Sequence, residues 1–309
     1  MPYRTCAIVN PNAGGGRLRR QWPRLLRRLV ALTDGLSVQW TTAPRSATVQ
    51  TRAALRNGFD RILAIGGDGT LHEVVNGFFE ERTAIAPEGT LVHLPFGTGV
   101  DFRRSLGIPT GLSSVDQLTS PKVRRIDLIR TLVTTDTGPQ TRYVANIASF
   151  GLGGLVVQSM QHLRGSALVG GRLSYLGAIL RGLATHVPPL VDLAVDDAQI
   201  GRVRIHNVAV ANGHTFGGGL PIAPRARIDD GRLDVVVLRD LPIRTLLRHA
   251  HRFYRGTHPG LDGVEIASGR RVVALPVDAP SVPMDLDGEP FGRLPAVFEL
   301  VPDALRVQG

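Results

Sequence analysis

Cysteine, lysine and long apolar runs are almost absent from this chain of 309 residues. Its one cysteine, Cys6, excludes an internal disulfide framework, and a metal site built from thiolates would need more. No run of about 18 or more apolar residues occurs, so the sequence predicts no membrane-spanning helix. The first ten residues lack the charged and apolar regions of a secretory signal, and we therefore expect a cytoplasmic protein without a signal peptide.

Aromatic residues are also scarce, at 5% of the chain, which leaves few side chains on which nucleic-acid bases could stack. The net charge is nevertheless +10, and it comes from arginine because Lys122 is the only lysine. Such an excess suits an anionic membrane surface or a phosphorylated ligand, although a basic protein with no special partner would show it too. We expect no nucleic-acid partner, and the sequence leaves a monomer and a homodimer both open.

The chain changes character near residue 122. Before it, apolar strand-like segments (residues 4–11, 36–42, 61–67 and 90–95) alternate with helical ones (17–32, 46–58 and 70–79), which indicates a parallel sheet. Ser46 is the candidate N-cap of the second helix. We therefore predict an α/β nucleotide-binding domain over residues 1–122, completed by residues 296–309.

Residues 123–295 read as short β-rich segments separated by turn residues, which predicts a second, antiparallel domain. One helical insertion interrupts these segments over residues 171–190. It carries Leu173, Leu176, Ile179 and Leu180 at helical spacing, a stripe that fits either a lipid pocket or ordinary core packing.

Three glycine-rich loops follow apolar strands of the first domain: NPNAGGGR (10–17), GGDGT (66–70) and PFGTGVDF (95–102). Ligands of open parallel sheets bind beyond the carboxyl ends of the strands, where glycine lets backbone amides approach phosphate oxygens. Neither the Walker A pattern nor G-x-G-x-x-G is present. Asp68, a carboxylate among these amides, suggests a bound Mg²⁺, and Asp101 could assist it or simply sit at a helix N-terminus.

These blocks, together with NIASFGLGG, the stretch from Ala211 to Leu238 and MDLDGEP, resemble the diacylglycerol kinase catalytic-domain family. The resemblance covers nearly the whole chain and is greatest to the bacterial soluble lipid kinases. It implies an NAD kinase-like nucleotide domain, a β-sandwich lipid-substrate domain and an active site in the cleft. It also implies transfer of a phosphoryl group from Mg²⁺·ATP to a lipid hydroxyl.

By position, the resemblance implies nucleotide contacts from the first loop, Thr41, the GGDGT loop and Thr98, with Thr42 as an alternative to Thr41. The residues are Asn10, Pro11, Asn12, Ala13, Gly14, Thr41, Gly66, Gly67, Asp68, Gly69, Thr70, Leu71, His72 and Thr98. Asp68, with Asp101, would orient Mg²⁺·ATP. Glu289 is the first candidate for the general base, with Asp287 coupled to it, although Asp-Gly alone is equally typical of a hairpin turn.

The resemblance further implies a structural magnesium site with Asp230 as the carboxylate ligand and Arg227 and Arg232 as carbonyl ligands, with Asp234 acting through water. A simple turn at Asp229–Gly231 is the alternative. One departure is clear, because the family usually has asparagine where Val100 stands.

Two other functions stay open: an NAD kinase-like enzyme with a soluble substrate, and a non-catalytic regulator that binds lipid or nucleotide. A lipid kinase would need to reach a bilayer. Basic residues crowd the first predicted helix and could face an anionic surface or merely solvent: Arg17, Arg19, Arg20, Arg24, Arg27 and Arg28.

Overall fold

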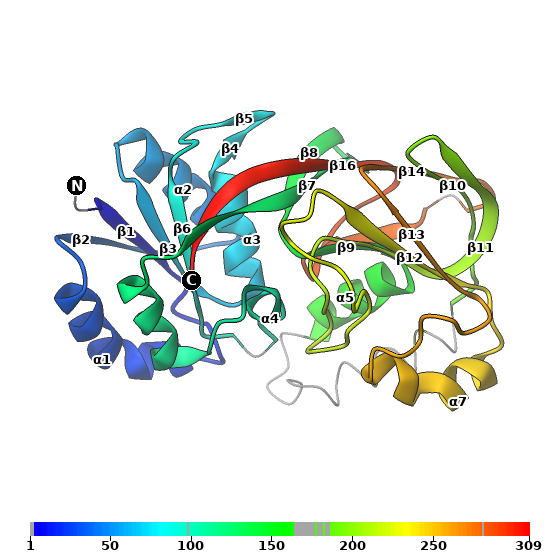
Figure 1. Ribbon diagram of the computed structural model, residues 1–309, viewed down its shortest axis with the longest axis horizontal. Helices are drawn as coiled ribbons and strands as arrows, with labels where there is room; N and C mark the ends of the chain where they lie inside the picture. Colours follow the sequence, from blue (N-terminus) through cyan, green and yellow to red (C-terminus); the bar gives the residue numbers. More distant parts are fainter. Residues whose placement is uncertain (1–2, 98, 164–176, 178–181, 183–185, 280) are drawn as a thin grey trace. The chain divides into compact units, whose positions relative to one another are not determined.

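The computed structural model describes residues 3–97, 99–163, 177, 182, 186–279 and 281–309. The chain forms two compact units, residues 1–128 with 302–309 and residues 129–301 (Figure 1). The sequence placed these boundaries at 122 and 296. The difference arises because both crossings fall inside long strands, β7 (Val123–Thr135) and β16 (Glu289–Gln308), whereas the composition changes where a strand begins.

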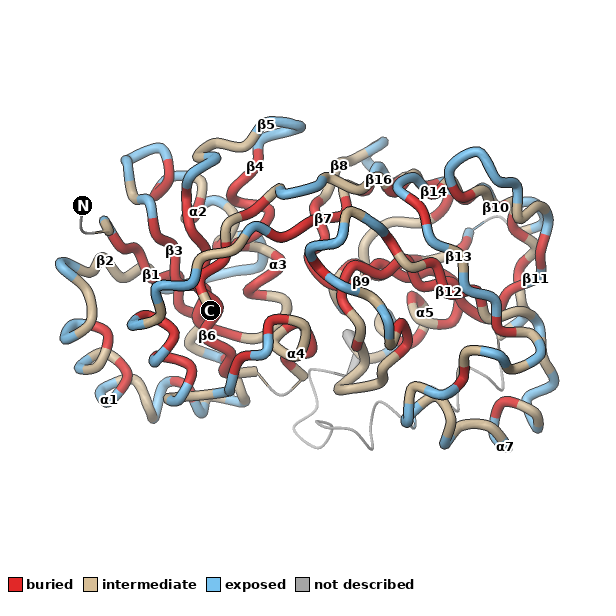
Figure 2. The backbone as a smooth tube through the Cα atoms, viewed as in Figure 1, coloured by how far each residue is buried: buried red, intermediate tan, exposed pale blue. Residues whose placement is uncertain are grey.

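The first unit is built on a parallel sheet, as the sequence predicted. Its strands β1 (Thr5–Val9), β2 (Leu36–Trp40), β3 (Arg61–Gly66) and β6 (Thr90–Pro95) lie in the order β2-β1-β3-β6. The end of β16 adds to β6 in parallel, with Arg306 opposite Thr90. The central strands are buried along their whole length (Figure 2), which explains their continuous apolar sequences.

Helices alternate with these strands along the chain, as in successive βα units. They are α1 (Arg17–Ala31), α2 (Ser46–Arg56), α3 (Asp68–Gly77) and α4 (Phe102–Leu106), with a 3₁₀ helix over Gly111–Thr119 and a small hairpin of β4 (Phe79–Glu80) and β5 (Thr83–Ala84). Helix α1 buries Leu18, Leu25 and Leu29 against the sheet. Helices α2 and α3 pack closely, since a Cβ on Gly77 would lie 2.5 Å from Thr51 Cβ.

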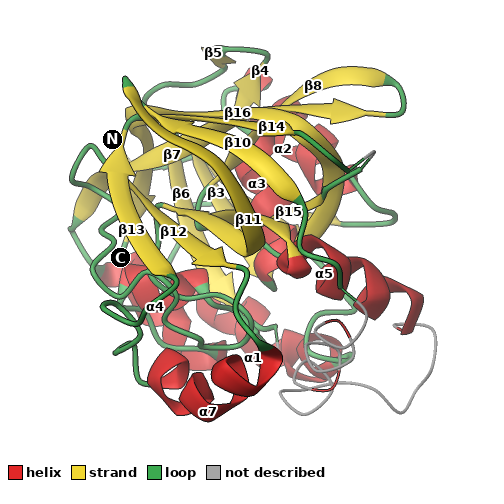
Figure 3. Cartoon of the chain, turned by 90° about the vertical axis from the view of Figure 1, so that its right-hand side faces the viewer, coloured by secondary structure: helices red, strands yellow, loops and turns green. Residues whose placement is uncertain are grey.

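The second unit is antiparallel, again as predicted. Strands β13 (Val264–Gly269), β12 (Leu233–Arg239), β11 (Ala198–Ala211), β10 (Leu190–Val195), β14 (Arg271–Pro276) and β16 follow one another across the sheet. Strand β9 (Ile147–Gly151) joins β11 to β15 (Pro283–Leu286), and β8 (Gly138–Val144) pairs with β7. Figure 3 shows these strands as a curved sheet. Phe150 and Phe298 belong to the core of this unit, and their rings stack with centroids 5.9 Å apart.

Helices of the second unit depart from the sequence prediction. Besides α5 (Leu152–Leu163), the structure contains α7 (Ile243–Tyr254) between β12 and β13, in a stretch where the sequence reading expected only β-rich segments. The predicted stripe of Leu173, Leu176, Ile179 and Leu180 lies outside the described residues. None of the helices described is long and apolar enough to cross a membrane.

The N-terminus of α2 is capped by a residue of the GGDGT helix. The predicted N-cap, Ser46, is wrong: its hydroxyl accepts hydrogen bonds from the amides of Thr42 and Ala43 and so fixes the preceding loop. The Glu73 carboxylate of α3 instead accepts the N–H groups of Arg45 (2.8 Å) and Ala47 (3.0 Å). Glu73 therefore ties the helix after the GGDGT loop to its neighbour.

Removing this cap should cost stability without touching the core. We expect Glu73→Ala to lower the free energy of unfolding by about 1–2 kcal/mol, because two helix-terminal amides lose a charged acceptor. Glu73→Gln keeps one acceptor oxygen and should lose roughly half as much. Urea unfolding followed by circular dichroism measures both changes, and an Ala variant as stable as the parent would contradict this assignment.

Candidate active site

Loops from three strands meet at one edge of the parallel sheet. Val9 lies opposite Ile65, and Gly66 lies opposite Pro95, so the segments after β1, β3 and β6 leave the sheet at the same level. The start of β2's loop joins them, because the Thr41 amide donates to the carbonyl of Val9 (2.9 Å). The sequence prediction that the glycine-rich loops share an edge is therefore confirmed by the register.

Glycine is required where these loops touch. A Cβ on Gly14 would lie 2.5 Å from the carbonyl oxygen of Phe96, and a Cβ on Gly97 would lie 2.6 Å from the Cα of Gly67. Both distances are too short for any side chain, so the loops are held backbone against backbone. A Cβ on Gly15 or Gly16 would meet nothing within 4 Å, which leaves this part of the first loop open beside the start of α1.

Polar side chains cross-link the same loops. The Asn10 amide donates to the Thr70 hydroxyl (3.0 Å), and its carbonyl oxygen accepts the N–H of Asn12 (3.0 Å). Asp68, the first residue of α3, accepts the backbone N–H of Asp101 through Oδ2 (3.0 Å). Asn10 and Asp68 thus fix the mutual position of all three loops.

The two acidic residues of this edge have different surroundings. The Asp101 side chain is nearly buried and forms an ion pair with Arg104, three residues further along (2.5 Å). Asp101 therefore has the partner expected of a charge at the start of helix α4, whereas Asp68 holds the loop through its carboxylate. Asp68 is the better placed of the two to meet a cation.

The remaining predicted nucleotide contacts divide by burial. Pro11, Asn12 and Gly69 are at least partly exposed, and Ala13 is buried. Leu71 and His72 point into the fold, with exposures of 2% and 8%, and the Leu71 amide already donates to Gly67. Their roles as nucleotide contacts remain predictions, as does that of Thr98, which lies outside the described residues.

Val100 adopts a backbone conformation that suits it poorly. Its φ is +41°, in the left-handed region that β-branched residues rarely enter, and its side chain is 4% exposed. Asparagine tolerates this region better, so the departure noted in the sequence carries strain on the order of 1–3 kcal/mol. The strain lies directly beside the amide that Asp68 accepts.

In the second unit, the candidate base motif forms a tight hairpin between β15 and β16. Leu286 pairs with Glu289, and the turn residues Asp287 and Gly288 both have positive φ, +53° and +80°. This is the geometry that Asp-Gly favours. The hairpin turn that the sequence allowed at Asp287-Gly288 is therefore present. This turn places the half-buried Glu289 at the first position of β16.

Asp287 anchors this hairpin. Its carboxylate accepts three backbone N–H groups at the start of β9: Ala145 (3.1 Å), Asn146 (2.8 Å) and Ile147 (3.3 Å). Its own amide donates to the Ile147 carbonyl (2.9 Å). Asp287 therefore has a structural role in this hairpin, and Glu289 stays the first candidate for the base.

Sequence reasoning missed Asp285, two residues before Asp287. It is buried in β15, accepts a hydrogen bond from the Ser149 hydroxyl and accepts the Gly288 N–H (3.3 Å). Burial raises the pKa of Asp285 to about 7 against those hydrogen bonds, and the nearby Asp287 and Glu289 carboxylates add to the rise. The sequence signal that could have indicated Asp285 is the run of three acidic residues at alternate positions, 285, 287 and 289.

The predicted structural magnesium loop has the features of a turn. The Asp230 carboxylate accepts the Arg232 N–H (3.1 Å), and Gly231 has φ +72°. The described residues contain no cluster of three histidine, cysteine or acidic side chains that could hold a metal. That result does not address ligation by the Arg227 and Arg232 carbonyls, so this site remains a prediction.

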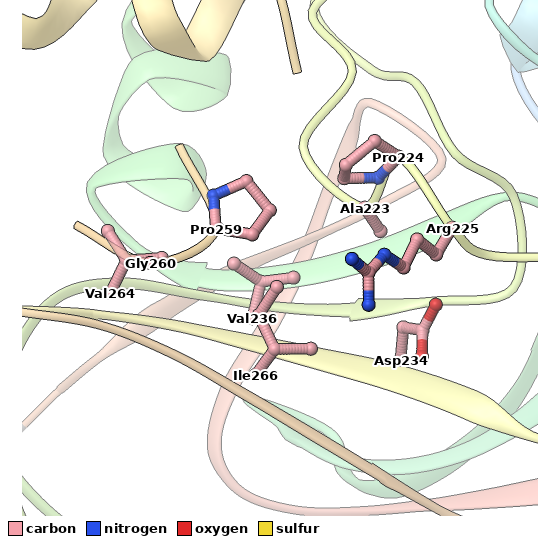
Figure 4. Close-up of a pocket in the computed structure, with 9 residues that line it drawn as sticks. All are labelled: Ala223, Pro224, Arg225, Asp234, Val236, Pro259, Gly260, Val264 and Ile266. Carbon is pink, nitrogen blue, oxygen red and sulfur yellow. The ribbon is translucent and has the colours of Figure 1, made fainter. Parts of the chain in front are cut away.

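Asp234 lines a pocket of about 530 Å³ next to this loop (Figure 4). Its carboxylate and the Arg225 guanidinium lie on the same side of the pocket, whose remaining walls include Val236, Val264 and Ile266. Burial raises the pKa of Asp234 and Asp230 adds to the rise, while Arg225 and Arg232 oppose it. A cation at Asp234 would therefore compete with Arg225.

Comparison with known families places both units. Residues 4–131 match the diacylglycerol kinase catalytic domain, and residues 146–309 match the YegS C-terminal NAD kinase beta sandwich-like domain. The chain therefore belongs to the diacylglycerol kinase-like lipid kinase family. The resemblance in its sequence blocks and the fold class predicted from them are confirmed.

Individual relatives agree. A diacylglycerol kinase of Bacillus subtilis (strain 168) is 28% identical over 295 residues, which cover 94% of this chain and 91% of that protein. A probable lipid kinase YegS-like of Pseudomonas aeruginosa (strain UCBPP-PA14) is 32% identical over 280 residues, covering 88% and 84%.

Solved structures show the same fold. A diacylglycerol kinase from Bacillus anthracis str. Sterne superposes with a TM-score of 0.74 at 21% identity, covering 99% of this chain and 97% of that one. An NAD kinase from Archaeoglobus fulgidus in complex with ATP superposes with a TM-score of 0.51 at 14% identity, covering 99% and 93%.

The backbone contact between the loops predicts one sharp difference between glycines. We expect Gly97→Ala to weaken ATP binding at least tenfold, because its Cβ would push the loop away from Gly67. Gly99→Ala is the matched control two residues away, since its Cβ would approach only Asp68 Oδ2, at 3.4 Å. Isothermal titration calorimetry with ATP compares them, and equal affinities would contradict the proposed contact.

The buried carboxyl of Asp285 predicts a pH dependence. Its pKa is higher in the folded state, about 7, than in the unfolded state, about 3.8, so the stability it contributes is fully present only below about pH 3.8 and is lost as pH rises from there through 7. Between roughly pH 6 and 8 the free energy of unfolding should fall by about 1.4 kcal/mol through this group.

Asp285→Asn should lack that decline while keeping an acceptor for the Gly288 amide. Urea unfolding of both proteins across this pH range isolates the contribution of Asp285, because the histidines are common to both. Parallel stability curves would show that Asp285 does not titrate in this range.

Proposed function

We propose that this chain transfers the γ-phosphate of ATP to a hydroxyl of diacylglycerol or a related lipid. Family membership makes it a lipid kinase with ATP as the expected phosphoryl donor. The observation that supports the specific reaction is the division of work among its carboxylates. Asp287 and Asp285 are committed to the hairpin and its support, while Glu289 stands at a fixed, half-buried position.

In the proposed reaction, the glycine-rich edge of the first unit binds the phosphates. Backbone amides of the open first loop and the N-termini of α1 and α3 favour negative charge there. A magnesium ion bound at Asp68 would neutralise charge on the transferring phosphoryl group. The arrangement fits such an ion because Asp68 is a hard oxygen ligand at the point where the three loops join.

Glu289 is the proposed general base. It would accept the proton of the lipid hydroxyl as the oxygen attacks phosphorus, so that the proton leaves the acceptor while the bond to ADP breaks. The hairpin turn and its three hydrogen bonds to Asp287 would hold the base in place for this step. Positioning and electrostatics suffice, and no covalent enzyme intermediate is needed.

Two alternatives have an observation in their favour. The fold shared with an ATP-bound NAD kinase favours an enzyme with a soluble nucleotide acceptor. The strained Val100, in place of the family's asparagine, favours a regulator that binds nucleotide or lipid without turnover.

The lipid acceptor is itself held in a bilayer, so the lipid kinase proposal also requires a surface that binds lipid. We therefore propose that the protein associates with the periphery of a membrane.

The decisive experiment measures transfer of labelled γ-phosphate from ATP·Mg²⁺ to micellar lipids. The panel contains diacylglycerol, monoacylglycerol, phosphatidylglycerol, ceramide and sphingosine, with NAD as the soluble control. Glu289→Gln should reduce transfer to its lipid by about 10²–10⁴-fold, because it cannot accept the proton. Asp68→Asn, which keeps a hydrogen-bond acceptor for Asp101, should abolish turnover.

The outcomes separate the candidates. Label on one lipid, lost in both variants, supports the kinase and names its acceptor. Label on NAD alone moves the activity to the soluble substrate. ATP binding without transfer to any acceptor, unchanged in Val100→Asn, supports the regulator.

A further inference from the structure

Among the described residues, helix α7 is attached to the second unit along one side. Leu246 is 7% exposed, and the ring of Phe253 stacks on that of the buried His258 at 4.7 Å and 10°. The Arg252 guanidinium donates two hydrogen bonds to the carbonyl of Thr257, at 3.0 and 2.7 Å. These contacts determine which side of the helix faces outward.

The outward side carries apolar residues that the fold does not use. Ile243, Leu247 and Tyr254 are exposed by 39%, 51% and 46%. They stand four and seven residues apart, a spacing that places them in one stripe along the helix. Figure 2 shows α7 largely in the colours of exposed and intermediate residues, in contrast to the buried strands above it.

Arginines flank this stripe. Arg244, Arg248 and Arg255 are exposed and repeat at four and seven residues, one position after each apolar residue. The helix contains no acidic residue, and none of these arginines pairs with an acid within the part of the chain that is described. The neighbouring acid Asp262 lines a small cavity of about 150 Å³ with Leu246 and Phe253, on the attached side.

We propose that α7 is the surface through which this protein docks on an anionic lipid bilayer. This inference rests on the proposed function, because a kinase whose acceptor is a lipid must reach that lipid in a membrane. The chemistry is that of an interfacial helix: apolar side chains enter the headgroup boundary, and arginines bind lipid phosphates while their alkyl stems lie along the apolar surface.

Helix α1 is the competing surface, and it lacks half of this chemistry. It exposes Arg19, Arg20, Arg24 and Arg27, but its apolar side chains pack inward, and only Val30 at its end is exposed, by 59%. Its Trp22 is partly buried, and the Trp22 ring packs edge to face against the ring of Trp40 at 4.6 Å. Charge alone would give weak and strongly salt-dependent attraction. The stripe holds one aromatic ring, that of Tyr254, beside the aliphatic Ile243 and Leu247, whereas a nucleic-acid site would present several rings on which bases stack.

The test measures binding of the full chain to vesicles, independent of turnover. Vesicles of phosphatidylcholine are compared with an equimolar mixture of phosphatidylcholine and phosphatidylglycerol, by sedimentation. The variant Arg244→Gln/Arg248→Gln/Arg255→Gln should lose affinity for the anionic vesicles on the order of 100-fold. The matched control Arg19→Gln/Arg20→Gln/Arg24→Gln removes the same charge from α1 and should stay within a few-fold of the parent.

A second variant reports insertion directly. Leu247→Cys can be labelled selectively with an environment-sensitive fluorophore, because Cys6 is fully buried and its thiol pKa is raised to about 11 by that burial. Its emission should shift to the blue on anionic vesicles and not on phosphatidylcholine alone. Leu247→Gln should weaken binding roughly tenfold without changing its salt dependence.

Kinase failure and docking failure are distinguishable. Loss of transfer to every lipid with intact, α7-dependent vesicle binding overturns the reaction and keeps the docking surface. The docking proposal is overturned if the α7 and α1 variants lose binding equally. It is also overturned if the label on residue 247 stays in water, or if the α7 variant loses affinity for duplex DNA but not for vesicles.

Discussion

Direct contact between backbones at the carboxyl edge of the parallel sheet is the constraint on which the first unit depends. Gly14 lies against the Phe96 carbonyl, and Gly97 lies against Gly67, so three loops with no sequence continuity become one surface. Asn10 and Asp68 then fix this surface through hydrogen bonds to Thr70 and to the Asp101 amide. Each glycine costs roughly 1 kcal/mol of backbone entropy, and the close approach of the loops is what this cost permits. The result is an edge formed mainly by backbone groups, to which Asp68 adds a carboxylate.

A different solution fixes the hairpin of the second unit. There a side chain, Asp287, binds the backbone of a neighbouring segment through three N–H groups. Asp287 is therefore used to hold the hairpin against the residues at the start of β9. Burial raises the pKa of the Asp285 carboxyl to about 7. Near neutral pH this carboxyl is therefore only partly ionised, which limits the negative charge beside Glu289. Three carboxylates within five residues are thus separated into an anchor, a support and a candidate base.

The sequence predicted the architecture well because its strongest signals are local. Buried strands followed by glycine loops specify βα units, and β-rich segments with turn residues specify the antiparallel unit. The failures have physical reasons. Ser46 has the chemistry of an N-cap, but Glu73 reaches the same amides from another helix, and no local pattern shows that. Helix α7 was missed because it buries only Leu246, and because apolar and basic side chains share its outer face, so no single apolar side marks it as a helix. Asp285 was missed because burial of an acid on a strand depends on the partner strand β9, which supplies Ser149.

Val100 shows where local preference and global fold disagree. A β-branched residue at φ +41° is unfavourable by itself, yet the loop around it is determined from outside. The Asp101 amide donates to Asp68, so the backbone directly after Val100 is held by another loop. The valine side chain gains burial at 4% exposure and would lie 3.0 Å from a Cβ on Gly97. An apolar side chain therefore packs at the position where the resemblance to the family implies an asparagine. Because valine has no hydrogen-bonding side chain, the hydrogen bond that Asp68 accepts from this loop comes from the backbone, through the Asp101 amide.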